Sequence, residues 1–116
     1  MKIYSGKAKS GKTIRMLRNF MDQSNSLFVT GEEIPSSLLK KCKDNNITTD
    51  NSIDKKVMFK PDFEIGDLTN VLKTQKEFKN IFIDVPKFAI NNSSTLEQLE
   101  SEYGVNLYIS SRDKVE

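Results

Sequence analysis

The chain contains no histidine and a single cysteine, Cys42, among its 116 residues. One cysteine excludes an internal disulfide and a four-thiolate metal site, and the absence of histidine excludes imidazole catalysis and histidine-ligated zinc. No run of about 18 apolar residues is present, so the sequence offers no candidate for a transmembrane helix. Met1-Lys-Ile-Tyr leads directly into a strand pattern without a secretory leader. We therefore expect a single cytoplasmic domain over residues 1–116.

An excess of charge of one sign is also absent. The 18 basic and 16 acidic residues leave a net charge of +2, which gives no support for binding to nucleic acid or to a membrane. Hydrophobic residues make up 36% of the chain, and they gather in clusters such as Ile81–Ile83 and Val105–Ile109. This distribution is typical of an ordered, soluble domain with a modest core.

Apolar patterning predicts an alternation of strands and helices. Strand patterns occupy Lys2–Ser5, Leu27–Thr30, Val57–Lys60, Ile81–Asp84 and Val105–Ser110. Helical spacing is present in Lys12–Gln23, Ser36–Lys43, Asp67–Phe78 and Ser94–Tyr103, whereas the polar segments Lys43–Asp54 and Ser111–Glu116 indicate a loop and a tail. The order is typical of an α/β domain with a mostly parallel sheet of about five strands, packed as a three-layer sandwich.

A glycine-rich motif separates the first strand from the first helix. Gly6, Lys7, Ala8, Lys9, Ser10, Gly11, Lys12 and Thr13 match the phosphate-binding loop G-x-x-x-x-G-K-[ST]. Its backbone amides and the positive end of the following helix attract phosphate oxygens. In such a loop Lys12 contacts the β- and γ-phosphates of a nucleoside triphosphate, and the Thr13 hydroxyl binds Mg²⁺. We therefore expect a P-loop that binds a nucleoside triphosphate with Mg²⁺.

The fourth predicted strand ends in a second candidate metal ligand. Ile81–Ile83 shows no polar alternation, which indicates burial on both faces, and Asp84 follows it. A carboxylate in this Walker B position holds Mg²⁺ directly or through water. The alternative is a structural carboxylate at the end of a buried strand. Val85-Pro86 comes next, so the glutamate that many P-loop ATPases carry directly after this aspartate is absent.

Paired carboxylates follow the second predicted strand. Glu32 and Glu33 come directly after Thr30-Gly31. A carboxylate at the carboxyl end of a parallel strand faces the same crevice as the P-loop, where it can orient or deprotonate an attacking water. The alternative is a pair of solvated loop acids.

The segment Thr30–Glu33 (Thr-Gly-Glu-Glu) and the helix after it resemble the second-strand signature of RadA/Sms-type and DnaB-type proteins. The helix contributes Leu38, Leu39, Lys41 and Cys42 to this likeness. These proteins are RecA-like ATPases, so the resemblance implies a RecA-like minimal core that uses ATP with Mg²⁺. It also implies that Glu32 is the catalytic base, with Glu33 as the alternative. Lys12 is the second candidate catalytic residue, through its contact with the phosphates.

The resemblance further implies that strand Val105–Ser110 lies between the P-loop strand and the Walker B strand. Its end, Ser110 or Ser111, falls where the family carries a γ-phosphate sensor. The family's core continues into DNA-binding loops and further strands that flank the P-loop strand. In their absence Lys2–Ser5 is expected to be an edge strand, which favours a homo-oligomer or a protein partner docked there. Arg112 is either a finger for a neighbouring subunit or a solvated charge.

Three functions are compatible with these motifs. The resemblance implies a small regulator or accessory factor of DNA replication or recombination, with slow ATP hydrolysis. A small thymidine-kinase-like nucleoside kinase is the second, because Ser10–Thr13 and Ile83–Phe88 are faintly similar to that family. A non-catalytic nucleotide-binding interaction module is the third.

Overall fold

The computed structural model describes residues 1–5, 11–47, 55–86, 88 and 93–111. Within these segments the predicted alternation of strands and helices is confirmed. The strands are β1 (Lys2–Ser5), β2 (Ser26–Thr30), β3 (Lys55–Phe59), β4 (Asn80–Asp84) and β5 (Asn106–Ser111), and the helices are α1 (Lys12–Asp22), α2 (Pro35–Asp44), α3 (Ile65–Thr74) and α4 (Ser93–Tyr103). None of the described helices is long and apolar enough to cross a bilayer.

Helix α3 differs most from its predicted range, Asp67–Phe78. It begins at Ile65 because Glu64 and Asp67 form a capping box, in which the Glu64 amide donates a hydrogen bond of 2.9 Å to Asp67 Oδ2. It ends at Thr74, and Phe78 lies in the connection to β4, where its side chain is buried. Phe78 fits helical spacing by residue type, but burial alone does not distinguish a helix from a loop that packs on the core.

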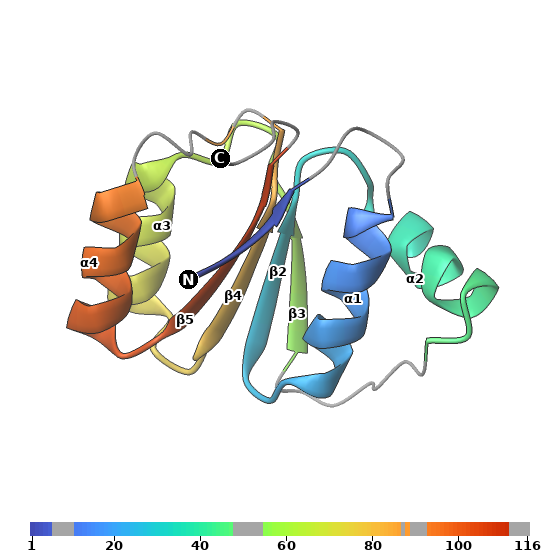
Figure 1. Cartoon of the computed structure of the whole chain (residues 1–116), viewed down its shortest axis with the longest axis horizontal. Helices are drawn as coiled ribbons and strands as arrows, with labels where there is room; N and C mark the ends of the chain where they lie inside the picture. The colour runs from blue at the N-terminus through green and yellow to red at the C-terminus, as the bar shows by residue number, and fades with distance from the viewer. Residues whose placement is uncertain (6–10, 48–54, 87, 89–92, 112–116) are drawn as a thin grey trace.

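The described strands form one sheet with the order β1-β5-β4-β2-β3, and every pair in it is parallel. Helices α1 and α2 cover one face and α3 and α4 cover the other, which gives three layers (Figure 1). The α/β fold with a five-stranded parallel sheet is thus as predicted. β5 lies between β1 and β4, and β1 is an outer strand of the described sheet.

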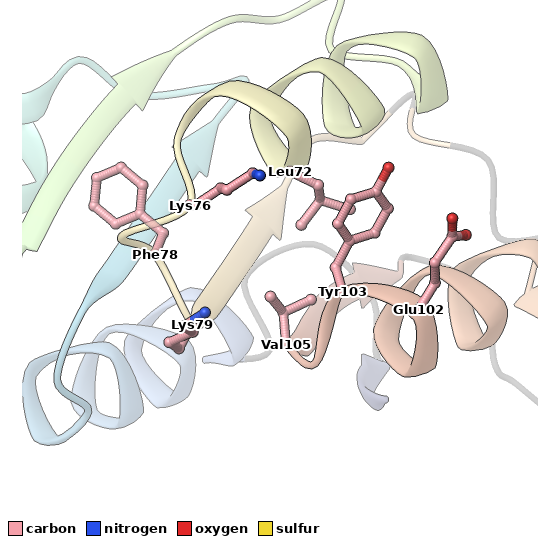
Figure 2. Close-up of a pocket in the computed structure, with 7 residues that line it drawn as sticks. All are labelled: Leu72, Lys76, Phe78, Lys79, Glu102, Tyr103 and Val105. Carbon is pink, nitrogen blue, oxygen red and sulfur yellow. The ribbon is translucent and has the colours of Figure 1, made fainter.

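Since all strands run in one direction, the sheet has an amino edge and a carboxyl edge. At the amino edge, a cavity of about 220 Å³ lies between the ends of α3 and α4 (Figure 2). Its lining residues are Leu72, Lys76, Phe78, Lys79, Glu102, Tyr103 and Val105. None of them is a candidate site residue, because the predicted motifs all follow strand ends at the carboxyl edge.

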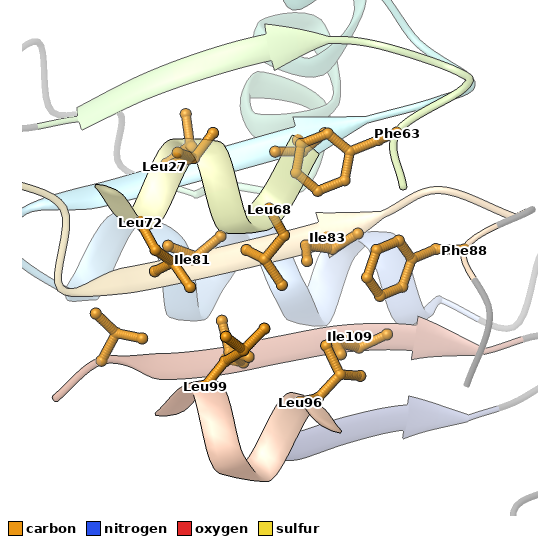
Figure 3. Close-up of a cluster of buried hydrophobic side chains, with 14 of the residues drawn as sticks. Leu27, Phe63, Leu68, Leu72, Ile81, Ile83, Phe88, Leu96, Leu99 and Ile109 are labelled. Atoms are coloured by element: carbon orange, nitrogen blue, oxygen red, sulfur yellow. The ribbon is translucent and has the colours of Figure 1, made fainter. Parts of the chain in front are cut away.

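The face toward α3 and α4 is aliphatic. Side chains from β2, β4 and β5 pack there against the two helices (Figure 3), and the members include Leu27, Val29, Leu68, Leu72, Ile81, Ile83, Leu96, Leu99, Leu107 and Ile109. Phe63 and Phe88, which also belong to this cluster, stack with ring centroids 5.9 Å apart. This cluster provides the larger part of the core.

The face toward α1 and α2 is aromatic at its centre. Phe28, Phe82 and Tyr108 lie side by side on β2, β4 and β5, with ring centroids 6.0 Å and 4.2 Å apart. Phe20 of α1 meets Phe28 and Phe82 edge-on at 5.4 Å and 5.7 Å. Such offset and edge-on contacts add to the free energy of burial. The aromatic row therefore fixes α1 against the sheet, and with it the start of α1.

Candidate functional site

A row of polar side chains crosses the carboxyl edge on the face toward α1. Val29, Ile83 and Ile109 pack toward α3 and α4, so the next residue of each strand points to the opposite face. These next residues are Thr30, Asp84 and Ser110. Thr30 and Asp84 are register partners, and Ser110 follows the paired residues Ile83 and Ile109. All three are buried.

Thr13 and Asp84, the two predicted metal ligands, come together at this edge. The Thr13 hydroxyl donates a hydrogen bond of 2.9 Å to Asp84 Oδ2, although the residues are 71 positions apart in the sequence. Thr13 is the second residue of α1, and Asp84 is the last residue of β4. The contact therefore joins the end of the glycine-rich motif to the central part of the sheet.

The start of α1 has the backbone expected where a loop turns sharply into a helix. Gly11, its N-cap residue, has φ of 84°, a left-handed conformation that side chains other than glycine rarely adopt. No side chain caps α1 by a hydrogen bond at this described N-cap. The first amides of a helix are the groups that bind anions at such a terminus.

Lys12 and Asp84 are the charged side chains that the described residues bury. They are each 7% exposed, whereas lysine and aspartate are almost never buried without a compensating interaction. Lys12 is also the first residue of α1, at the positive end of the helix dipole, where a cation is unfavourable by itself. Asp84 accepts the hydrogen bond from Thr13 and Lys12 also makes an interaction, so neither buried charge stands alone.

Glu32 and Glu33 follow β2 at the same edge, but they are held differently. Glu33 forms an ion pair with Lys41 of α2, and its amide donates a hydrogen bond of 3.2 Å to Thr30 Oγ1. The Glu32 side chain is exposed. Gly31 joins this turn to β4, because its amide donates to the Asp84 carbonyl at 2.9 Å.

The other candidate residues divide into described and undescribed positions. Ser110 lies buried on β5 in the polar row. Ser111 ends β5, and its side chain is outside the described part. Gly6, Lys7, Ala8, Lys9, Ser10 and Arg112 lie outside the described residues. The sequence singles out Thr30 only as part of the Thr-Gly-Glu-Glu motif, yet the Thr30 side chain belongs to the polar row. The two-residue period of β2 carries the signal that identifies it.

Thr13 and Asp84 together offer a hydroxyl and a carboxylate oxygen, which are ligands of the kind that Mg²⁺ takes from proteins. The described residues contain no group of three or more acidic, histidine or cysteine side chains that could enclose a metal. Mg²⁺ commonly takes one or two protein oxygens and completes its shell with phosphate and water.

Comparison of the chain with protein-family models and with curated proteins found no match in either set.

Proposed function

We propose that this protein binds a nucleoside triphosphate, ATP by resemblance, with Mg²⁺ as a RecA-like P-loop domain. The observation that carries the proposal is the hydrogen bond between Thr13 and Asp84. A chance match to the P-loop pattern gives no reason for its hydroxyl residue to meet an aspartate at the end of another strand. A shared metal ion gives such a reason, because both oxygens are hard ligands suited to Mg²⁺.

The roles follow from the positions of the residues. Thr13 and Asp84 would hold Mg²⁺, which neutralises charge on the β- and γ-phosphates. Lys12 and the amides at the start of α1 would bind the phosphate oxygens, together with the motif residues Gly6–Gly11. The buried position of Lys12 strengthens its interaction with an anion, because a partly desolvated site has a lower effective dielectric constant than water.

The strand order supports the RecA-like assignment. In that family the sensor strand lies between the P-loop strand and the Walker B strand, and β5 lies between β1 and β4. Ser110 at the end of β5 is the candidate sensor of the γ-phosphate. Glu32 is the candidate base that orients water, and without a glutamate directly after Asp84 we expect hydrolysis to be slow.

Nucleotide binding is testable by thermal unfolding. At a ligand concentration of 100 Kd, binding stabilises the folded state by about 2.7 kcal/mol. A domain of this size gains roughly 4 °C in Tm per kcal/mol, so ATP with Mg²⁺ should raise Tm by about 11 °C. Lys12→Ala should abolish this shift. An unchanged affinity for ATP in Lys12→Ala would contradict the site.

Turnover separates the candidate functions. Under the proposal, phosphate release is slow and falls further in Glu32→Gln while ATP binding persists. Transfer of phosphate to an added nucleoside would instead identify a kinase. Binding without any release or transfer would identify a non-catalytic module.

A further inference from the structure

The turn between β2 and α2 is fixed on the side of α2 through Glu33. The Glu33 side chain is 22% exposed and pairs with Lys41, which is 39% exposed. Its second carboxylate oxygen, Oε2, is buried and has no hydrogen-bond partner among the described residues. Lys41 is thus the cation that compensates a partly buried carboxylate. Such a carboxylate is costly to leave alone.

The same turn is fixed on the side of β4 through Gly31. A Cβ atom at this position would lie 3.1 Å from Val85 Cγ1 and 3.3 Å from Val85 Cα, so glycine permits the close approach. The approach lets the Gly31 amide donate its 2.9 Å hydrogen bond to the Asp84 carbonyl. Glu32 is the residue between these two attachments.

We propose that Glu33 and Lys41 form a latch that holds the β2–α2 turn, so that Glu33 is a positioning residue for Glu32 rather than a second base. The Glu33 carboxylate forms an ion pair with Lys41 of α2, and the Glu33 amide donates a hydrogen bond to Thr30 Oγ1. Glu32 keeps the role of candidate base that the resemblance assigns to it. The positioning of Glu32 for catalysis rests on the proposed function, whereas the hold of Glu33 and Lys41 on the turn does not.

The latch predicts a local loss of order when the cation is removed. Lys41→Met keeps the apolar stem and deletes the charge, so the Glu33 carboxylate should turn toward water and pull on its own backbone. Amide hydrogen exchange measured by NMR should then become at least tenfold faster at Gly31 and Glu33, whose amides hold the turn. Lys60, whose amide donates to the Thr30 carbonyl at 2.9 Å, should keep its rate.

Matched variants make this measurement decisive. Lys40→Met removes an exposed lysine one residue earlier on α2 and should leave the turn unchanged. Lys41→Arg preserves the charge and should restore slow exchange. Equal exchange in Lys41→Met and Lys40→Met would overturn the latch. So would an acceleration that includes Lys60 equally, because that pattern reports a global loss of stability.

Kinetics provide the second readout. In Lys41→Met, kcat for phosphate release should fall about tenfold while KM and the ATP-induced rise in Tm stay at parental values, and Lys41→Arg should recover kcat. A kcat equal to that of Lys40→Met would overturn the positioning role. If the parent protein neither binds ATP nor releases phosphate, the proposed function fails, and the exchange rates at Gly31 and Glu33 still decide the latch.

Discussion

Asp84→Asn separates the metal role of Asp84 from its structural role. In the parent protein the Thr13 hydroxyl donates a hydrogen bond of 2.9 Å to Asp84 Oδ2. In the absence of ligand, the asparagine side chain of the variant still offers an oxygen that can accept this hydrogen bond. A hydrogen bond to a charged group contributes about 1.5–3 kcal/mol and a neutral one about 0.5–1.5. The difference is offset in part because a buried charge is removed. The ligand-free free energy of unfolding should therefore change by about 1 kcal/mol or less.

The effect on Mg²⁺-dependent binding should be larger. Loss of a carboxylate that binds or orients a metal typically costs about 10–100-fold in metal affinity. At an ATP concentration of 100 parental Kd, the stabilisation then falls from about 2.7 kcal/mol to roughly 0.4–1.4 kcal/mol. With roughly 4 °C per kcal/mol, the rise in Tm should fall from about 11 °C to about 2–6 °C.

Differential scanning fluorimetry with ATP and either Mg²⁺ or EDTA measures this change. With EDTA the variant and the parent should give the same shift, because the metal-dependent interaction is absent from both. Asp62→Asn is the control, since the Asp62 side chain is 80% exposed and lies outside the site. A full parental shift with Mg²⁺ in Asp84→Asn would refute the assignment of Asp84 as a metal ligand.

Three further predictions concern the core, the thiol and the edge of the sheet. Phe82→Ala should lower the free energy of unfolding by about 3–5 kcal/mol, because Phe82 is fully buried among three other rings; urea unfolding checks this, and a loss below about 1 kcal/mol would contradict it. Burial raises the pKa of the Cys42 thiol above its ordinary 9.0, so Cys42 should resist iodoacetamide in the folded protein. The folded state binds this proton more tightly than the unfolded chain, so the urea midpoint should fall as pH rises above that ordinary value; a Cys42→Ala variant should lose this part of the decline. The outer position of β1 predicts self-association, and light scattering that finds a strict monomer at high concentration, with and without ATP, would reject it.

The sequence was sufficient for the elements and for the edge where the motifs meet. Apolar runs separated by helical spacing predict parallel strands, and parallel strands bring Thr13, Glu32 and Asp84 to the same edge. The sequence was not sufficient for the direction of each carboxylate. Glu32 and Glu33 are the same residue type, and they differ because Lys41, the seventh residue of α2, pairs with Glu33. A contact of that kind depends on where α2 packs, which no local pattern specifies.

The predicted ends of α3 differ from the observed ones for a similar reason. Phe78 has the residue type and spacing of a helix face, but the capping box at Glu64 and Asp67 sets where α3 begins. Helix α3 ends at Thr74, and Phe78 in the following connection is still buried in the core. Hydrophobic periodicity reports which side chains are inside, and the termini depend on individual hydrogen bonds.

The polar residues on the α1 face of the sheet occur at both ends of the aromatic row, and the two ends differ in kind. At the amino edge, Asn106 Nδ2 donates to Asn80 Oδ1 at 3.1 Å, and Asn80 Nδ2 donates to the Ser24 carbonyl at 2.8 Å. These amides satisfy one another and carry no charge, which suits a closed structural layer.

The carboxyl edge has the opposite character. It places the Asp84 carboxylate beside the Thr13 hydroxyl. A row of neutral amides contains no such charge. Lys12, buried at the positive end of α1, adds a second charge to the same region. A fold that required only stability could repeat the amide layer at both ends. We propose that a ligand carrying both phosphate and metal accounts for this charged layer, as expected if a nucleotide binds at this edge.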